Sequence, residues 1–254
     1  MDIVQKFYNN MAQKYDKLFS DWDTAVKEEA EMLDKLFREE GYGKDAEILD
    51  CACGIGTQSI GLAALGYNVT ASDISEGELT EARKRAEERN VKISFEKADF
   101  RTLPTLFNKK FKLIIAMDNA LPHMLNGSEL KKAIESIAES LEKGGMFVAS
   151  IRDYDALLSE KPSYSPPYIY KTEAGQRVSF QVWNWEGDNY KLTQYIIEDG
   201  EKIEASKFEC EYRAVKREEL TELFLESNCS RVCWKFPEET GFYQPILIAK
   251  KDID

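Results

Sequence analysis

The stretch ILDCACGIGTQSIG, residues 48–61, decides the fold of this chain. It begins as an apolar run typical of a buried strand, passes through an acid and two closely spaced glycines, and continues as an amphipathic segment. This order predicts a strand, a tight turn and a helix. Gly54 and Gly56 favour backbone conformations that other residues avoid, and they let a ligand approach the main chain. The stretch is therefore predicted to line a ligand site.

Strand and helix signals alternate on both sides of this stretch. Amphipathic spacing at residues 4–19 and 25–37 predicts two helices before the first strand. Strand-like runs then alternate with amphipathic segments as far as Asp155, and they read EILDCA, YNVTASD, VKISFEKAD, FKLIIAMD and GGMFVASIRD. Short strands separated by helices form a parallel sheet with helical crossovers. The predicted fold class is therefore α/β, with an open, doubly wound, Rossmann-like sheet.

The pattern changes after Asp155. Between Tyr168 and Tyr212, strand-like runs are separated by short turn sequences, which predicts antiparallel hairpins. A helix pattern, REELTELFLESN, and the strand-like runs SRVCWKF and GFYQPILIAK follow. These last segments predict a return to the core sheet that ends in an antiparallel pair. The hairpins are therefore an antiparallel β insert, or cap, on the α/β core.

Composition excludes several kinds of partner. A net charge of −12 and a pI near 4.8 repel phosphate backbones and anionic lipids, so we expect neither nucleic acid nor a membrane as partner. The chain has no run of about 18 apolar residues and no secretory signal pattern, which favours a cytoplasmic location. Its five cysteines form no repeated C-x-x-C pair, and His123 is its sole histidine, so we predict no metal site and no disulfide framework.

Acidic residues end the first three predicted strands. Asp50 suits a ligand that carries an ammonium group and disfavours a nearby pyrophosphate. Asp73 lies 17 residues beyond Gly56, where a carboxylate can accept hydrogen bonds from both hydroxyls of a ribose. Asp99 and Phe100 offer an acceptor for an exocyclic amine and a flat apolar surface for a purine. The dinucleotide fingerprint requires a third glycine where this chain has serine, which weighs against a nicotinamide cofactor.

These residues stand in a pattern that resembles a known family. The segments that carry the resemblance span roughly residues 48–171 and read DCACGIG, SIGL, GYNVTASDISEGELTEA, EKADFRTL, DNALPHM, GGMFVASIRDYD and PPYIYK. The N-terminal FYNNMAQKYDKLFSDWD is similar to the lid helix of related small-molecule methyltransferases. The chain resembles a class I S-adenosylmethionine-dependent methyltransferase and is closest to the glycine and sarcosine N-methyltransferase type. The resemblance implies S-adenosylmethionine as cofactor and S-adenosylhomocysteine as product.

The pattern and the resemblance together divide the chain into four parts. We expect N-terminal lid helices in residues 1–40, a cofactor-binding α/β core in 41–155, an antiparallel β cap in 156–212, and a C-terminal helix and strands that complete the core in 213–254. The residues expected to bind the cofactor are Tyr8, Tyr15, Asp50, Ala52, Gly54, Gly56, Asp73, Ile74, Asp99, Phe100 and Met117. Ala52 replaces the first glycine of the commonest cofactor motif, a variant that the glycine N-methyltransferase type shares. Tyr8 and Tyr15 are expected over the methionine end of the cofactor, with core packing as the alternative.

Three residues are expected to act on the methyl acceptor. By resemblance, Asn119 holds the acceptor amine with its amide oxygen, Arg152 clamps a carboxylate of the substrate, and Tyr170 closes over the acceptor. A guanidinium pairs bidentately with a carboxylate, so an acidic small substrate is implied if Arg152 faces the site. The alternative is that Asp153 or Asp155 neutralises Arg152 and holds it away from the site.

Three functions compete at this point. The first is an N-methyltransferase for the amine of a small metabolite, such as the amino acids glycine or sarcosine. The second is a methyltransferase for an oxygen, carbon or other heteroatom acceptor on a small molecule, because the cofactor residues are compatible with all of these. The third is a non-catalytic cofactor-binding protein, or a nicotinamide enzyme that uses the same fold. The first two imply a small-molecule acceptor, for which His123 is either a general base or a structural residue.

Overall fold

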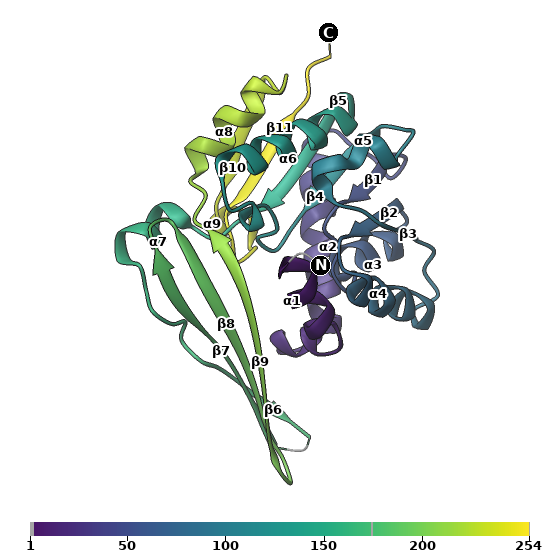
Figure 1. The fold of residues 1–254 in the computed structure, drawn as a ribbon. Helices are drawn as coiled ribbons and strands as arrows, with labels where there is room; N and C mark the ends of the chain where they lie inside the picture. Colours follow the sequence, from purple (N-terminus) through teal and green to yellow (C-terminus); the bar gives the residue numbers. More distant parts are fainter. Residues whose placement is uncertain (1–2, 174, 254) are drawn as a thin grey trace.

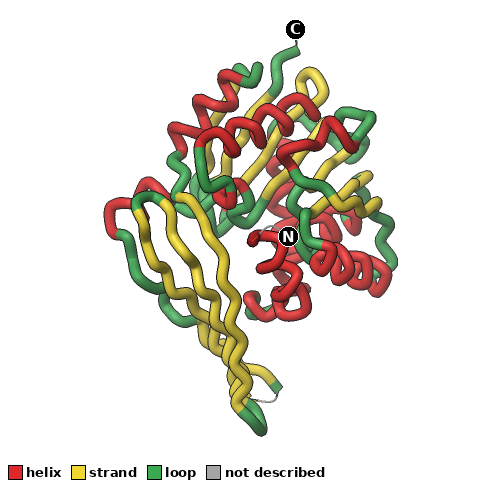
Figure 2. The backbone as a smooth tube through the Cα atoms, in the orientation of Figure 1, coloured by secondary structure: helices red, strands yellow, loops and turns green. Residues whose placement is uncertain are grey.

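The computed structural model describes residues 3–173 and 175–253, which form two β-sheets with helices packed on the larger one (Figure 1). A seven-stranded sheet forms the centre of an α/β core, and a four-stranded antiparallel sheet projects from it (Figure 2). The core strands are β1 (Glu47–Asp50), β2 (Asn68–Asp73), β3 (Ser94–Lys97), β4 (Phe111–Ala116), β5 (Leu141–Ser150), β10 (Arg231–Lys235) and β11 (Ile246–Lys250). The projecting strands are β6 (Tyr168–Thr172), β7 (Gly175–Glu186), β8 (Asn189–Asp199) and β9 (Ile203–Arg213). The predicted α/β class with an antiparallel β insert is confirmed.

The order of the core strands creates a crevice. The order is β10-β11-β5-β4-β1-β2-β3, with β1 to β5 parallel and β10 and β11 antiparallel. The chain places β2 and β3 on one side of β1 and then returns to place β4 on its other side. Strand order therefore reverses between β1 and β4, and in open α/β sheets ligands bind beyond the carboxyl ends of the strands at that point. The predicted closing pair is confirmed as β10 and β11.

Helices cover both faces of the core sheet. Helices α2 (Trp22–Glu39) and α3 (Thr57–Ala64) pack on one face, and α6 (Gly127–Ser140) and α8 (Arg217–Glu226) pack on the other. Successive side chains of β4 alternate between the two layers: Leu113 and Ile115 join the α2–α3 cluster, whereas Ile114 joins the α6–α8 cluster. The remaining helical elements are α1 (Ile3–Met11), η1 (Ala12–Leu18), α4 (Glu76–Glu88), η2 (Phe100–Thr102), α5 (Leu103–Leu106), η3 (Leu121–His123), α7 (Tyr154–Glu160) and α9 (Pro237–Thr240).

The N-terminal segment lies between the core and the projecting sheet (Figure 1). The sequence pattern predicts one helix over residues 4–19, but the structure has the α-helix α1 followed by the 3₁₀-helix η1. The Asn9 side chain ties α1 to the start of α4, because its Oδ1 accepts hydrogen bonds from Ser75 Oγ at 2.8 Å and from the Gly77 backbone N–H at 2.9 Å. The other face of α1 contacts β9. The segment is thus held from two sides.

Within the described residues, no helix has both the length and the apolar character needed to cross a lipid bilayer. The amphipathic helices instead direct their apolar faces to the core sheet. The buried residues of α2, for example, include Ala30, Leu33 and Phe37, which belong to one core cluster.

Helices α2 and α3 approach closely at Gly61. A Cβ atom at this position would lie 2.6 Å from the Ala30 Cβ and even closer to the Val26 carbonyl oxygen. No side chain fits there without a shift of the α2 backbone, so glycine sets the distance between the two helices that cover this face.

We expect Gly61→Ala to destabilise the protein by about 1–3 kcal/mol, the usual cost of overpacking a filled core. The gain in helix propensity, about 1 kcal/mol, works in the opposite direction and reduces the net loss. Urea unfolding measures the change. Gly127→Ala is the matched control, because a Cβ there meets only a Glu219 side-chain oxygen at 3.8 Å. Equal midpoints for the two variants would mean that α2 and α3 separate easily.

Candidate active site

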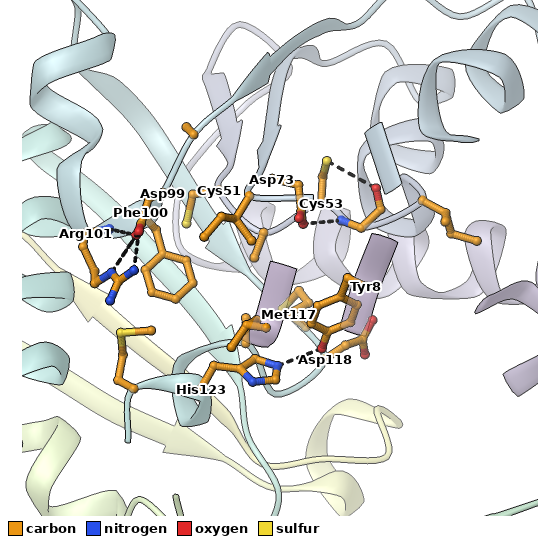
Figure 3. A pocket seen from close by; sticks show the side chains of 18 of the residues that line it. Tyr8, Cys51, Cys53, Asp73, Asp99, Phe100, Arg101, Met117, Asp118 and His123 are labelled. Atoms are coloured by element: carbon orange, nitrogen blue, oxygen red, sulfur yellow. Dashed lines mark hydrogen bonds and ion pairs between the residues drawn. The ribbon is translucent and has the colours of Figure 1, made fainter. Parts of the chain in front are cut away.

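The crevice at the carboxyl ends of β1 and β4 contains a cavity of about 250 Å³, called the cleft below (Figure 3). Its wall comes from α1, η1, the β1–α3 turn and the segments that follow β2, β3 and β4. Among its lining residues are nine of those that the sequence analysis singled out for the cofactor: Tyr8, Tyr15, Ala52, Gly54, Asp73, Ile74, Asp99, Phe100 and Met117. Segments far apart in the sequence thus meet at one place.

The β1–α3 turn fixes the position of Asp73. Gly54 adopts the left-handed region with φ 52°, and its backbone N–H donates to Asp73 Oδ2 at 2.9 Å. The Ser75 backbone N–H donates to the other oxygen, Oδ1, at 2.8 Å. Burial raises the pKa of the Asp73 carboxyl, and these N–H groups oppose that effect. The carboxylate is therefore rigidly placed, and each of its oxygens keeps a lone pair for a ligand.

Two of the residues singled out for the cofactor lie behind the wall of the cleft. Gly56, with φ 91°, is the residue before α3 and shapes the turn. Asp50 is buried and accepts a hydrogen bond from Ser59 Oγ at 2.6 Å. Burial raises the pKa of Asp50 to about 7. Their direct contact with a cofactor stays a prediction.

Asp99 faces an arginine that sequence analysis did not consider. The Arg101 guanidinium donates to Asp99 through Nε at 2.9 Å and through Nη2 at 2.5 Å (Figure 3). Arg101 also contacts Glu129 at 3.2 Å, and both residues line the cleft. These two hydrogen bonds from Arg101 hold the Asp99 carboxylate beside the ring of Phe100.

A strained turn follows β4. Asp118 and Asn119 are consecutive non-glycine residues in the left-handed region, with φ 56° and 69°. Such residues cost about 1–3 kcal/mol each and persist only where the surroundings fix them. Here the end of β5 does so: Ser150 Oγ accepts from the Asp118 N–H at 2.8 Å, and the Ser150 carbonyl accepts from the Asn119 N–H at 3.0 Å. As a result, Asp118 lines the cleft, whereas Asn119 does not.

Asp118, which is partly buried, and Glu29, which is buried, form an acid pair bridged by an amide. Gln58 Nε2 donates to Asp118 Oδ2 at 2.8 Å and to Glu29 Oε2 at 2.6 Å, and Tyr243 Oη donates to Asp118 Oδ1 at 2.7 Å. No lysine or arginine of the described residues forms an ion pair with either acid. Burial and then Asp118 raise the pKa of Glu29 to about 9. The pair therefore holds a proton near neutral pH, because Glu29 is buried and two carboxylates that share one amide group repel each other when both are ionised. Asp118 could have been found from the sequence, since it ends the strand-like run FKLIIAMD as Asp73 ends the run YNVTASD.

Arg152 lies outside the cleft, in a cluster of aromatic and amide side chains. Its guanidinium donates to Tyr190 Oη at 2.8 Å and to Gln181 Oε1 at 2.9 Å, and it lies 4.9 Å from the centre of the Trp183 ring. Asn119 completes the arrangement from the core side. The members of this group, called the Arg152 cluster below, are Asn119, Arg152, Tyr154, Gln181, Trp183, Tyr190 and Tyr212.

The acidic neighbours of Arg152 have another partner. Arg217 on α8 pairs with Asp153 at 2.5 Å and with Asp155 at 3.3 Å. Arg152 has no ion pair with a carboxylate in the described part of the chain, and it keeps some accessible surface. The alternative in which Asp153 or Asp155 neutralises Arg152 is therefore wrong.

Asn119 and Tyr170 have contacts that bear on their predicted roles. Asn119 Oδ1 accepts hydrogen bonds from the Arg152 backbone N–H and from Tyr154 Oη, both at 3.1 Å, while its buried Nδ2 has no partner. The free group of this amide is thus a donor. Tyr170 on β6 donates to the Leu18 carbonyl at 3.3 Å and is not among the lining residues of the cleft.

Tyr212 joins the cleft to the Arg152 cluster. Tyr8 and His123 line the cleft and are hydrogen-bonded to each other at 2.8 Å. The Tyr8 hydroxyl also lies 3.3 Å from the Tyr212 hydroxyl, and the His123 ring centre lies 4.2 Å from that of Tyr212. The centre of the Tyr212 ring is 5.6 Å from the Arg152 guanidinium carbon. A ligand in the cleft and a ligand at Arg152 would therefore be separated by one tyrosine.

Comparison with known proteins agrees with this geometry. Residues 48–145 match the family described as a methyltransferase domain. A glycine/sarcosine N-methyltransferase of Parasynechococcus marenigrum is 27% identical over 154 residues, which are 61% of this chain and 53% of that protein. The match thus spans about half the length of that relative.

Two solved structures share the fold over nearly the whole chain. An S-adenosylmethionine-dependent methyltransferase from Clostridium acetobutylicum superposes with a TM-score of 0.77 at 23% identity, covering 96% of this chain and 99% of the other. An amino pentose methyltransferase from Micromonospora echinaspora, solved with S-adenosylmethionine bound, has a TM-score of 0.73 at 17% identity and coverage of 89% and 91%.

Residues 48–145 therefore match a methyltransferase domain, and the chain has the fold of S-adenosylmethionine-dependent methyltransferases, as the motifs around residues 48–61 indicated. Within that class, its sequence relatives include glycine/sarcosine and glycine N-methyltransferases.

We expect Asp73→Ala to weaken binding of S-adenosylhomocysteine by roughly 2–4 kcal/mol, because it removes charge-assisted acceptors for two ribose hydroxyls. Isothermal titration calorimetry measures the change. Lys97→Ala, at the exposed end of the neighbouring strand β3, is the control. A loss of less than about threefold would place Asp73 outside the binding site.

We expect the protein to lose stability as the pH rises from about 5 to about 9, because the Glu29 carboxyl keeps its proton when folded and loses it when unfolded. The raised folded pKa contributes stability that is complete below the unfolded pKa and is lost as the pH approaches the folded one. Glu29→Gln should flatten this decline by at least about 1 kcal/mol between pH 6 and 8.5, measured by urea unfolding. Glu31→Gln, at an exposed position on α2, should leave it unchanged. Parallel declines in Glu29→Gln and the wild type would contradict the shared proton.

Proposed function

We propose that the protein is an S-adenosylmethionine-dependent N-methyltransferase that acts on the amine of a small metabolite carrying a carboxylate, such as the amino acids glycine or sarcosine. The observation that carries this proposal is the Arg152 guanidinium, which sits among neutral side chains without an acidic partner in the described residues. A charge in neutral surroundings costs free energy unless a counter-ion pairs with it. A carboxylate of the acceptor supplies that counter-ion.

The chemistry of the cleft fits S-adenosylmethionine. Arg101 is the only lysine or arginine among the described residues of the wall, and it is paired with Asp99. Neither Asp73 nor Asp118 has a lysine or arginine partner in the described residues. This distribution disfavours a pyrophosphate and suits a ligand with a positive charge and a diol. The bound cofactor supplies an electrophilic methyl group on a sulfonium. The protein aligns that methyl with the acceptor and excludes water.

The Arg152 cluster supports a specific orientation of the acceptor. Arg152 keeps accessible surface, so we assign its guanidinium to the carboxylate of the acceptor, and the buried, unpartnered Asn119 Nδ2 is a second donor in the same cluster. This changes the role expected for Asn119, whose amide oxygen already accepts two hydrogen bonds. The amine then points past Tyr212 toward Tyr8 and His123 in the cleft. Tyr8 and Tyr15 cover the cofactor in this arrangement, and Tyr170 steadies the N-terminal segment through Leu18.

A second acceptor class is an amino sugar, because one solved structure with the same fold over 89% of the chain is described as an amino pentose methyltransferase. Aromatic side chains such as Trp183 and Tyr190 also suit the faces of a sugar ring. The proposal further includes a cytoplasmic setting, which the five free cysteines of the described residues support.

We expect Arg152→Lys to lower kcat/KM at least tenfold for a carboxylate-bearing amine while S-adenosylhomocysteine affinity stays within about twofold, because only the acceptor loses its two-pronged donor. A methyl-transfer assay over amino acids, amino sugars, phenols and thiols identifies the acceptor first. Arg231→Lys, at an exposed arginine that pairs with Glu40, is the matched control. Wild-type efficiency of Arg152→Lys on the best acceptor would reject the carboxylate and favour an amino sugar or another neutral metabolite.

A further inference from the structure

The acid pair of Glu29 and Asp118 reaches the cleft through Asp118. Asp118 lines the cleft and keeps part of its surface accessible, whereas Glu29 is buried and is not among the lining residues. Each oxygen of the Asp118 carboxyl accepts a hydrogen bond, Oδ2 from Gln58 Nε2 at 2.8 Å and Oδ1 from Tyr243 Oη at 2.7 Å. A carboxylate oxygen has two lone pairs, so each oxygen can accept a further hydrogen bond from a ligand in the cleft.

The surroundings of the acid pair do not supply a positive charge. In the described part of the chain, neither carboxyl forms an ion pair with a lysine or arginine. The other titratable groups that face the pair are tyrosine hydroxyls and carboxyls, which belong to Tyr15 of η1, Tyr243 before β11, Asp50 of β1 and Glu28 of α2. Two close carboxyl groups without a cation are costly to ionise, and a cation in the cleft would remove that cost.

The strand order brings the methionine end of the cofactor to this pair. The lining residues of the cleft follow four neighbouring strands, in the order β3, β2, β1 and β4. Under the proposed function, the adenine lies beside Phe100 after β3 and the ribose lies at Asp73 after β2. The rest of the cofactor then passes the β1–α3 turn toward Asp118. Two strand spacings are about 10 Å, which the atoms between the ribose and the α-amino group can span.

Asp50 is the other acid that suits an ammonium group, but its side chain is 1% exposed and is not among the lining residues of the cleft. It accepts hydrogen bonds from Ser59 Oγ at 2.6 Å and from the Ala52 backbone N–H at 3.4 Å. Asp73 is held by two backbone N–H groups at the ribose position. Asp118 is therefore the acid that the methionine end can contact.

We propose that Asp118 binds the α-ammonium group of the cofactor, and that the acid pair releases its shared proton to water as this group arrives. The inference rests on the proposed function, in that S-adenosylmethionine occupies the cleft. The O–H bond of the protonated carboxyl breaks, the proton leaves to the solvent, and the ammonium balances the charge that remains on the pair. Cofactor affinity therefore rises with pH as long as the free pair still holds its proton.

Asp118→Asn tests the contact. Asparagine keeps the shape of the side chain and tolerates the left-handed conformation of this position. We expect calorimetry to show at least about tenfold weaker binding of S-adenosylhomocysteine, because a charge-assisted hydrogen bond is lost. Binding of 5′-methylthioadenosine should stay within about twofold, because this nucleoside has no ammonium group that could donate to Asp118. Asp45→Asn, at an exposed position, is the matched control and should change neither affinity.

Calorimetry in two buffers of different ionisation enthalpy measures the proton release. At pH 8, the wild type should release roughly 0.4–0.9 proton more per S-adenosylhomocysteine than Glu29→Gln. The reason is that the pKa of the Glu29 carboxyl is about 9 in the free protein, and a nearby cation lowers such a pKa to between about 6 and 8. His123 also lines the cleft, but both proteins contain it, so its titration cancels in the difference.

The possible outcomes separate this inference from the proposed function. Unchanged affinity for S-adenosylhomocysteine in Asp118→Asn, or equal proton release in the wild type and Glu29→Gln, would overturn the inference alone. An equal loss for both ligands would place Asp118 at the nucleoside and overturn the ammonium assignment. A higher KM for the methyl acceptor at unchanged S-adenosylhomocysteine affinity would assign Asp118 to the acceptor amine and overturn it as well. A wild type that binds neither ligand would overturn the proposed function too.

Discussion

The turn after β4 is the constraint on which both halves of the site depend. Two adjacent residues, Asp118 and Asn119, adopt a conformation that side chains disfavour, and Ser150 holds both of their backbone N–H groups. One side chain faces the cleft and the other faces the Arg152 cluster. If Asp118 and Asn119 adopted ordinary backbone conformations, their side chains would no longer point to these two different places. The end of β5 therefore positions both the cleft and the core side of the Arg152 cluster.

Charge is distributed unequally between these two sides. The cleft side is acidic, with Asp73 on its wall and the shared-proton pair of Glu29 and Asp118. The acceptor side has a single guanidinium in neutral surroundings. Such an arrangement attracts a cation to one side and an anion to the other, and under the proposed function it would orient a zwitterionic acceptor before any contact with the cofactor forms. Tyr212 lies between the acidic cleft and the Arg152 guanidinium.

Much of the fold was predictable because strand and helix periods are local properties of the sequence. The run FKLIIAMD predicts a buried strand, and the structure places its side chains alternately in two core layers. Tyr8 and Asp73 line the same cleft only because the folded chain brings them together, and hydrophobic periodicity carries no such information. The resemblance to a family was what predicted that both residues bind the cofactor. The ion pair of Arg217 with Asp153 joins residues that are 64 positions apart, and no sequence pattern indicates it. The contacts of Gln58 with two acids are likewise a property of the folded chain alone.

The projecting sheet has a consequence for how this chain could diverge from its relatives. Strands β7, β8 and β9 align Trp185, Tyr190 and Tyr212 in one cross-strand row, while Arg152 and Asn119 come from the core. Under the proposed function, the range of acceptors would depend largely on this separate sheet, which can accumulate substitutions without disturbing the motifs around Gly54. The register of the row, however, is set by the tight turn at Gly187. A single inserted residue there would turn every aromatic side chain of the following strand to the opposite face, so in evolution the range should change by side-chain replacement and not by change of loop length.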